Sequence, residues 1–400
     1  MLPDDLFAQL SRDAARRLRY TPDLLPSFEA WTCRVRAKLG DLLRSDLWPS
    51  SPLSVTVTGR EDGDGYVRER LEFEGGPLFS GSVYLLIPAR LAKPVPGILC
   101  FHGHGGYMAG KDMVAGVVET HPIAIECAEA LNYGYGVQLA KAGYVTLCPD
   151  AFNFGERLLA KHRWAEKHVC NDYFQDLLLY GYNLMGITVG TNIRLIDYLL
   201  SRPEVSASGV GCCGLSYGGL QAVFTMAMDE RIRAGVVSGA LHSMADLQAA
   251  AGGGGMCGAQ IVPGMLEWFD FDDLAKSLAP RPVFYEMMRR DRCFNFEESF
   301  ALYGQITELY GRLGVPERTG LNTPDTDHRY SGVNVPAFFE RNLGPKSETK
   351  WPSYKQADHP GPRAKTNRLL YGESVNENGD ENGERLWFPL TRNPFSSPFS

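Results

Sequence analysis

The residues best suited to do chemistry in this 400-residue chain surround Ser216, in the segment Gly214-Leu-Ser-Tyr-Gly218. This is a G-x-S-x-G pattern between a short apolar run, Val210–Cys213, and a helix-like run over residues 220–228. On such a strand-to-helix turn the serine is strained and its hydroxyl exposed, and the glycines let the turn close without Cβ clashes. The following helix N-terminus supplies free N–H groups. The pattern predicts a serine nucleophile, although an ordinary tight turn can carry the same residues.

A serine nucleophile needs a base, and an acid that orients the base. His328, in a loop between the last predicted strand and a helix from about Val335, is the leading candidate for the base. Asp291, which follows the predicted strand 282–288, is the candidate acid, and the order Ser216, Asp291, His328 is that of α/β-hydrolase triads. Three arginines flank Asp291, so the alternative interpretation is that Asp291 only forms ion pairs with them. The competing carboxylates are Glu286, Asp270, Asp272 and Asp273.

The tetrahedral intermediate of acyl transfer also needs N–H donors for its oxyanion. The glycine-rich segment Phe101-His-Gly-His-Gly-Gly106 follows an apolar strand and can turn its amides toward a developing charge. We expect one donor to be the N–H of His104 and the other the N–H of Tyr217, next to the serine. A plain glycine-rich turn is the alternative interpretation.

Alternating strands and helices must position these residues. Apolar strand-like runs at 97–101, 144–148, 210–213, 233–238 and 282–286 alternate with helix-like runs, including 186–200 and 296–313. This alternation predicts an α/β fold with a mostly parallel sheet and helices on both faces. Ligands of such sheets bind beyond the carboxyl ends of the strands, where Ser216 lies.

The chain resembles α/β-hydrolases and, within them, the dienelactone-hydrolase-like and acetyl-xylan-esterase-like serine esterases. The resemblance covers roughly residues 80–343, and its matching segments are 102–106, 110–112, 150–156, 194–205, the serine turn, 279–282, 291–294 and 327–328. It implies the α/β-hydrolase fold and hydrolysis of carboxylic esters through an acyl-enzyme. Dienelactone hydrolases proper carry a cysteine nucleophile, so Ser216 argues against that activity.

Two other functions stay open. The same core resembles serine peptidases or amidases of the prolyl-oligopeptidase type, but the roughly 95 residues before the first core strand are too few for their β-propeller. A non-hydrolytic binding or lyase-like protein is the third interpretation, against which the Ser/Asp/His set argues. The acyl and alcohol groups and the oligomeric state cannot be read from the sequence.

The resemblance implies a small-molecule ester as the partner, and the composition argues against two other classes of partner. The net charge of −7 argues against nucleic acid or an anionic membrane. No apolar run has transmembrane length, and the start of the chain does not read as a secretory signal. The nine scattered cysteines suggest buried, reduced thiols in a cytoplasmic protein. His102 and His104, or His162 and His168, have no matching acid or thiolate cluster in the sequence, so we expect no metal, and no cofactor.

The predicted organisation has three parts. Residues 1–50 form an N-terminal helical cap, in which Leu6, Leu10, Ala14 and Leu18 recur with helical spacing. Residues 51–344 form the catalytic domain, which opens with antiparallel strands and carries insertions at 150–185 and 241–272. These insertions are candidates for a lid. Residues 345–400 are polar, acidic and proline-rich, and we expect a largely disordered tail.

Overall fold

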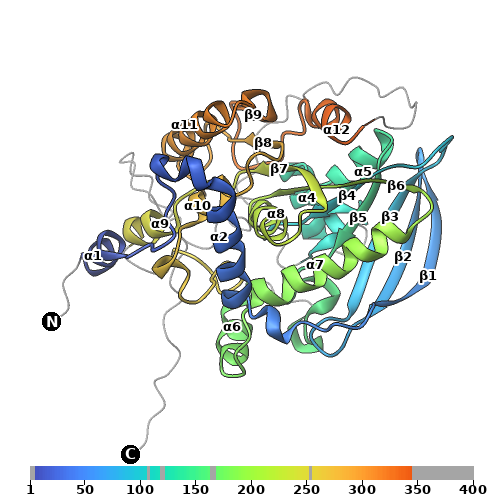
Figure 1. Cartoon of the computed structure of the whole chain (residues 1–400). Coiled ribbons are helices and arrows are strands. Elements are labelled where there is room, and N and C mark those ends of the chain that lie inside the picture. Colours follow the sequence, from blue (N-terminus) through green and yellow to red (C-terminus); the bar gives the residue numbers. More distant parts are fainter. Residues whose placement is uncertain (1–4, 106–108, 118–121, 163–167, 252–254, 345–400) are drawn as a thin grey trace, which may run out of the picture.

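A nine-stranded sheet forms the centre of the computed structural model, which describes residues 5–105, 109–117, 122–162, 168–251 and 255–344 (Figure 1). The strand order is β1-β2-β3-β5-β4-β6-β7-β8-β9. The strands are β1 (Ser54–Gly63), β2 (Tyr66–Glu74), β3 (Gly81–Pro88), β4 (Val95–Phe101), β5 (Val145–Pro149), β6 (Val205–Leu215), β7 (Ile232–Ser238), β8 (Val283–Glu286) and β9 (Thr319–Asn322).

Strands β4 to β9 pair in parallel, whereas β1, β2 and β3 form an antiparallel meander that joins the sheet through β5. All residues of β4 and β5 are buried, as expected for strands that are covered on both faces. Cys100 of β4 lies opposite Cys213 of β6, and the strand order places both strands inside the sheet, so the predicted strand 210–213 is a central strand. Because β4 to β9 run parallel, their carboxyl ends lie along the same edge of the sheet.

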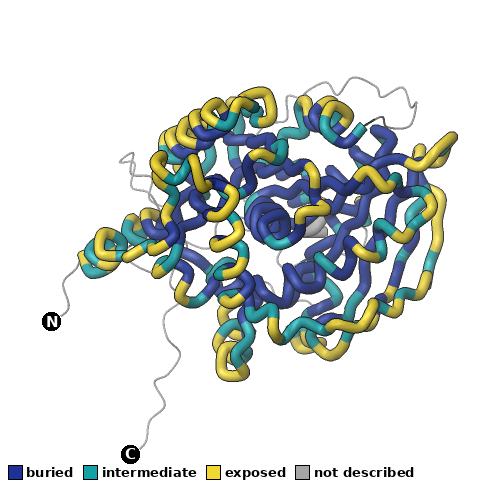
Figure 2. The backbone as a smooth tube through the Cα atoms, in the orientation of Figure 1, coloured by how far each residue is buried: buried dark blue, intermediate teal, exposed yellow. Residues whose placement is uncertain are grey.

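Helices cover both faces of the sheet, as predicted. One apolar cluster joins α2, α7, α8, α10 and α11 to one face, and a second joins α3, α4, α5 and α12 to the other. Helix α8 is buried almost all round (Figure 2). The helices are α1 (Leu6–Asp13), α2 (Phe28–Leu42), α3 (Lys111–Val114), α4 (Pro122–Leu131), α5 (Tyr135–Lys141), α6 (Cys170–Leu178), α7 (Leu184–Ser201), α8 (Tyr217–Met228), α9 (Met244–Ala250), α10 (Phe271–Lys276), α11 (Phe296–Arg312) and α12 (Val335–Leu343).

The N-terminal segment packs on the same apolar core as the sheet. Trp31 of α2 is buried, donates its indole N–H to the carbonyl of Leu18, and belongs to the cluster of α7 and α8. The helical spacing through Leu18 overstates α1, which ends at Asp13. The backbone of Leu18 instead donates to the carbonyl of Trp268, so a tertiary contact replaces the helical one. The domain boundary at residue 50 stays a prediction.

The two insertions contain short helices that the sequence did not reveal. Helix α6 and two short 3-10 segments, Gly155–Arg157 and Ala160–His162, lie in the insertion at 150–185. Helix α9 and the 3-10 segment Met265–Glu267 lie in the insertion at 241–272. The predicted disordered tail, 345–400, lies outside the described residues.

The free edge of the meander is irregular. Strand β1 is half-exposed or exposed along its whole length, and its pairing with β2 shifts register between Val57 and Gly59. At the opposite end of the sheet, β9 contains four residues. Within the described ranges, no helix has both the length and the apolar character needed to cross a membrane.

Candidate active site

Ser216 occupies a strained turn between β6 and α8. Its φ of 60° and ψ of −123° lie outside the regions that L-residues ordinarily adopt. The turn is held by its backbone: the N–H of Ser216 donates to the carbonyl of Ser238 at 2.8 Å, and its own carbonyl accepts from Gly219 and Leu220. A Cβ on Gly218 would lie 2.1 Å from the carbonyl oxygen of Phe101, so only glycine fits there. The sequence pattern thus forms the sharp strand-to-helix turn that it predicts.

His328 and Asp291 lie together, although they are 37 residues apart. Nδ1 of His328 is 2.8 Å from Oδ2 of Asp291, and both side chains are buried. The other carboxylate oxygen, Oδ1, accepts the backbone N–H groups of Cys293 at 2.7 Å and Phe294 at 3.1 Å. Two amides and one imidazole therefore fix the carboxylate, as an acid that orients a catalytic histidine requires.

Gly239, directly after β7, connects this pair to the serine turn. A Cβ on Gly239 would lie 3.0 Å from Cε1 of His328, so the imidazole packs against this glycine. The residue before it, Ser238, accepts the N–H of Ser216. Ser216, Asp291 and His328 thus follow β6, β8 and β9 at one edge of the sheet. Their catalytic roles stay predictions.

The competing carboxylates have other partners. Asp270 caps α10 and accepts the hydroxyl of Ser243, while Asp273 completes the capping box. Asp272 pairs with Lys276 at 2.6 Å. These three carboxylates therefore support the start of α10.

Glu286, at the end of β8, supports the loop of His328. It accepts the backbone N–H groups of Ser331 at 3.2 Å and Gly332 at 2.9 Å. Burial raises the pKa of Glu286 to about 7, although hydrogen bonds from Ser238 and these amides oppose that shift. The glutamate ties the end of β8 to a loop just three residues beyond His328.

The loop after β4 lies against the serine. A Cβ on Gly103 would approach Cβ of Ser216 to 3.1 Å, so the backbone of this loop passes directly beside the nucleophile candidate. The N–H of Tyr217 precedes the hydrogen bonds of α8, which begin with Gly219, and is one of the free amides of a helix N-terminus. The roles of the His104 and Tyr217 amides stay predictions, and Gly106 lies outside the described residues.

His102 has a structural role in the same loop. Its Nε2 accepts the N–H of Ala151 and its Nδ1 lies 2.9 Å from the carbonyl of Gly103, which requires the neutral ring with the proton on Nδ1. Burial lowers the pKa of His102 to about 4, which agrees with a neutral ring. This histidine joins the loop after β4 to the loop after β5.

A buried ion pair fastens these two loops further. Nζ of Lys111 lies 2.7 Å from Oδ2 of Asp150, and Oδ1 accepts the backbone N–H of Lys111 at 2.7 Å. Both side chains are fully buried, and Glu156 donates its N–H to the same carboxylate. A Cβ on Gly110 would lie 2.1 Å from Asp150, which explains the glycine there. The motifs at 110–112 and 150–156 thus form one network that joins the segment after β4 to the loop after β5.

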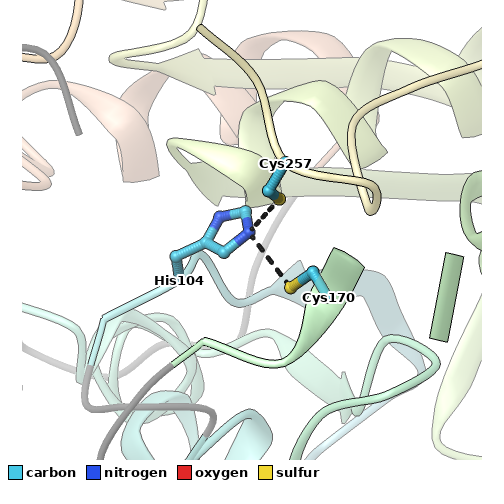
Figure 3. A group of neighbouring side chains, drawn as sticks. All are labelled: His104, Cys170 and Cys257. Atoms are coloured by element: carbon cyan, nitrogen blue, oxygen red, sulfur yellow. Dashed lines mark hydrogen bonds between the residues drawn. The ribbon is translucent and has the colours of Figure 1, made fainter. Parts of the chain in front are cut away.

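Two cysteines that the sequence did not single out lie beside His104, in the loop after β4. Nε2 of His104 is 2.9 Å from Sγ of Cys257 and 3.8 Å from Sγ of Cys170 (Figure 3). The His104 ring packs on Tyr217 with 4.9 Å between ring centroids, so the cluster adjoins the serine turn. The pKa of the Cys257 thiol lies well below its ordinary value, mainly because of a hydrogen bond with Cys170 and to a smaller extent because of the nearby His104. Burial opposes this shift. Separations of 66 and 153 residues left no spacing signal in the sequence.

Known proteins resemble this chain along most of its length. The model of the Abhydrolase family matches residues 5–342. A Bacillus subtilis (strain 168) protein named "Putative hydrolase YtaP" is 26% identical over 279 residues, which is 69% of this chain and 87% of that protein.

Solved structures share the fold. A structure from Bacteroides fragilis NCTC 9343, described as a "putative acetyl xylan esterase", has a TM-score of 0.67 at 20% identity and covers 86% of this chain and 90% of its own. A glucuronoyl esterase from Solibacter usitatus has a TM-score of 0.54 at 16% identity, over 79% of this chain and 94% of its own. The α/β-hydrolase fold that the sequence predicted is confirmed.

Proposed function

Since the chain belongs to the Abhydrolase family, we propose that it is a serine hydrolase that cleaves a carboxylic ester through an acyl-enzyme intermediate. The observation that carries this proposal is the strained Ser216 turn at the same sheet edge as the His328–Asp291 pair. The likeness to a structure described as a "putative acetyl xylan esterase" and to a glucuronoyl esterase supports the esterase part of this proposal.

The proposed reaction begins when Oγ of Ser216 attacks the ester carbonyl and Nε2 of His328 takes the hydroxyl proton. Asp291 keeps the proton on Nδ1 and stabilises the imidazolium that forms. The N–H groups of Tyr217 and His104 donate to the oxyanion of the tetrahedral intermediate. Collapse of this intermediate breaks the ester C–O bond, and His328 returns the proton to the leaving alcohol. A water molecule, activated by the same histidine, then hydrolyses the acyl-enzyme.

A small-molecule ester is the proposed substrate class. His104 and Tyr217 connect the site to the insertions, since His104 contacts Cys170 of one insertion and Cys257 of the other. Both insertions thus reach the loop beside Ser216, which supports a role for them in limiting the size of the acyl or alcohol group. A cytoplasmic location belongs with this proposal and rests on the pattern of scattered, mostly buried cysteines.

Turnover of p-nitrophenyl acetate, butyrate and octanoate by wild type and Ser216→Ala tests the proposal. We expect hydrolysis that favours short acyl chains. In the variant, kcat should fall by about 10⁴-fold or more, because removing one triad member disables the whole unit. Ser206→Ala is the matched control, because Ser206 is a half-buried serine at the other end of β6. It should keep wild-type rates.

Equal rates in wild type and Ser216→Ala would contradict the proposed nucleophile. A matched p-nitroanilide separates esterase from amidase: the peptidase-type alternative predicts that the anilide is cleaved at a rate comparable to that of the ester. A binding or lyase-like protein would hydrolyse neither compound above the rate of the variant.

A further inference from the structure

We propose that His104, Cys170 and Cys257 form a zinc site that fastens both insertions to the loop beside Ser216. This differs from the sequence-based expectation of no metal, which rested on the lack of a thiolate cluster in the sequence. The fold gathers one that the sequence disperses (Figure 3).

The donor atoms are spaced for a small metal ion. Nε2 of His104 and both Sγ atoms lie within 4.8 Å of one another. With Zn–S bonds of about 2.3 Å and Zn–N bonds of about 2.0 Å, tetrahedral ligands stand roughly 3.5–3.8 Å apart. The 3.8 Å between His104 and Cys170 meets this value. The 2.9 Å between His104 and Cys257 is shorter, so Sγ of Cys257 must withdraw by roughly 0.6 Å to bind the ion.

The chemistry of the donors selects the ion. Two thiolates and one imidazole suit zinc, whereas calcium and magnesium prefer oxygen ligands. Three protein ligands leave a fourth position for water or another donor. Cys170 is buried and the other two residues are half-buried, so the site is sheltered from solvent.

The histidine is held in orientation by its aromatic neighbours. Its ring packs on Phe154 at 5.3 Å, on His168 at 5.3 Å and on Tyr217 at 4.9 Å between centroids. Such packing limits rotation of the imidazole and keeps Nε2 directed toward the two thiols. A ligand that is already oriented loses less conformational entropy when it binds a metal.

Among the residues that the structure describes, a second cluster of possible ligands, Asp291, Cys293 and His328, is a weaker candidate. Nδ1 of His328 already lies at hydrogen-bond distance from Asp291, whose second oxygen accepts two backbone N–H groups. A metal ion would have to displace these bonds. Cys293→Ser therefore separates the two clusters in an experiment.

Zinc at the proposed site would connect three segments far apart in the chain. Cys170 begins α6 in the insertion at 150–185, Cys257 lies in the insertion at 241–272, and His104 lies just after β4. One ion would thus link both insertions to the loop that carries a proposed oxyanion donor. Metal binding itself requires no catalysis, so its failure would leave the proposed function untouched.

Metal content measures the site directly. The full-length chain, reduced and stripped with a chelator, is incubated with Zn²⁺ or Co²⁺ and separated from free metal. We expect about one ion per chain, and for Co²⁺ a thiolate charge-transfer band together with the intense visible bands of a tetrahedral site. Cys170→Ser and Cys257→Ser should each reduce bound metal at least tenfold. The exposed Cys33→Ser and the half-buried Cys293→Ser are controls that should keep it.

Protection from alkylation gives a readout that does not depend on whether the variants fold. Zinc should slow iodoacetamide labelling of Cys170 and Cys257 in the wild-type chain and leave Cys33 unaffected. The proposal is wrong if wild type binds well under one ion per chain, if Cys293→Ser alone loses the metal, or if zinc protects neither cysteine. Rapid formation of a Cys170–Cys257 disulfide in the presence of zinc would overturn it too.

Discussion

Replacing Asp291 by asparagine tests how His328 is oriented. The carboxylate gives Oδ1 to the N–H groups of Cys293 and Phe294 and leaves Oδ2 for Nδ1 of His328. An asparagine keeps a single acceptor oxygen, and the two amides hold it in the place of Oδ1. Its NH₂ group must then face His328, and since two donors cannot bond, Nδ1 gives up its proton. Nε2 becomes protonated and can no longer accept the proton of Ser216.

The expected loss follows from this change of tautomer. A triad histidine in the wrong tautomer lowers kcat by about 10⁴, which corresponds to roughly 5 kcal/mol of activation free energy. The fold should persist, because the bonds to Cys293 and Phe294 remain. We therefore expect a melting temperature close to that of wild type and a KM changed by less than about threefold.

Steady-state hydrolysis of p-nitrophenyl acetate measures the effect. The matched control is Asp325→Asn, in the same loop as His328, where an exposed carboxylate lies 3.4 Å from Arg290. Exposed ion pairs contribute little, so this variant should keep its rate within about twofold. A kcat for Asp291→Asn above about a tenth of the wild-type value would refute the assigned orientation of His328.

Three further predictions concern stability. Burial raises the pKa of Glu286 from 4.5 to about 7, so the folded state holds a proton that the unfolded state releases. The contribution of this group to stability should fall by roughly 3 kcal/mol as pH rises from 4.5 to 7, and in urea unfolding Glu286→Gln should lose less stability over that range than wild type by about this amount. Lys111→Met leaves the buried Asp150 carboxylate without its ammonium partner and should cost about 3–5 kcal/mol, measured by thermal denaturation. Trp31→Ala should cost about 3–5 kcal/mol in one cooperative calorimetric transition, whereas an independent 1–50 unit would give two transitions.

Local patterns let the sequence predict most of the framework. The strands and the serine turn follow from apolar runs and from glycines that no other residue can replace, as at Gly218. The order of residues along the chain selected Asp291 and His328, and in the structure Oδ2 of Asp291 lies 2.8 Å from Nδ1 of His328. These features depend on neighbours within a few residues, or on an order of elements that parallel sheets share.

Contacts between distant segments explain what the sequence missed. The run from Leu6 to Leu18 has helical spacing, but α1 ends at Asp13 and the N–H of Leu18 bonds to the distant Trp268 instead. Cys170 and Cys257 carry no signal of their own, because only the fold places them beside His104. Lys111 was noticed only through a family resemblance, and its buried pairing with Asp150 depends on two loops that follow different strands.

The irregular β1 edge has a consequence for how molecules associate. A long, flat edge strand invites pairing with the edge of another copy, but β1 shifts register at Val57 and then runs through the charged residues Arg60, Glu61 and Asp62. The other edge, β9, is only four residues long. Neither described edge is a good template for extending the sheet between copies. We therefore expect the protein to resist sheet-mediated aggregation at high concentration.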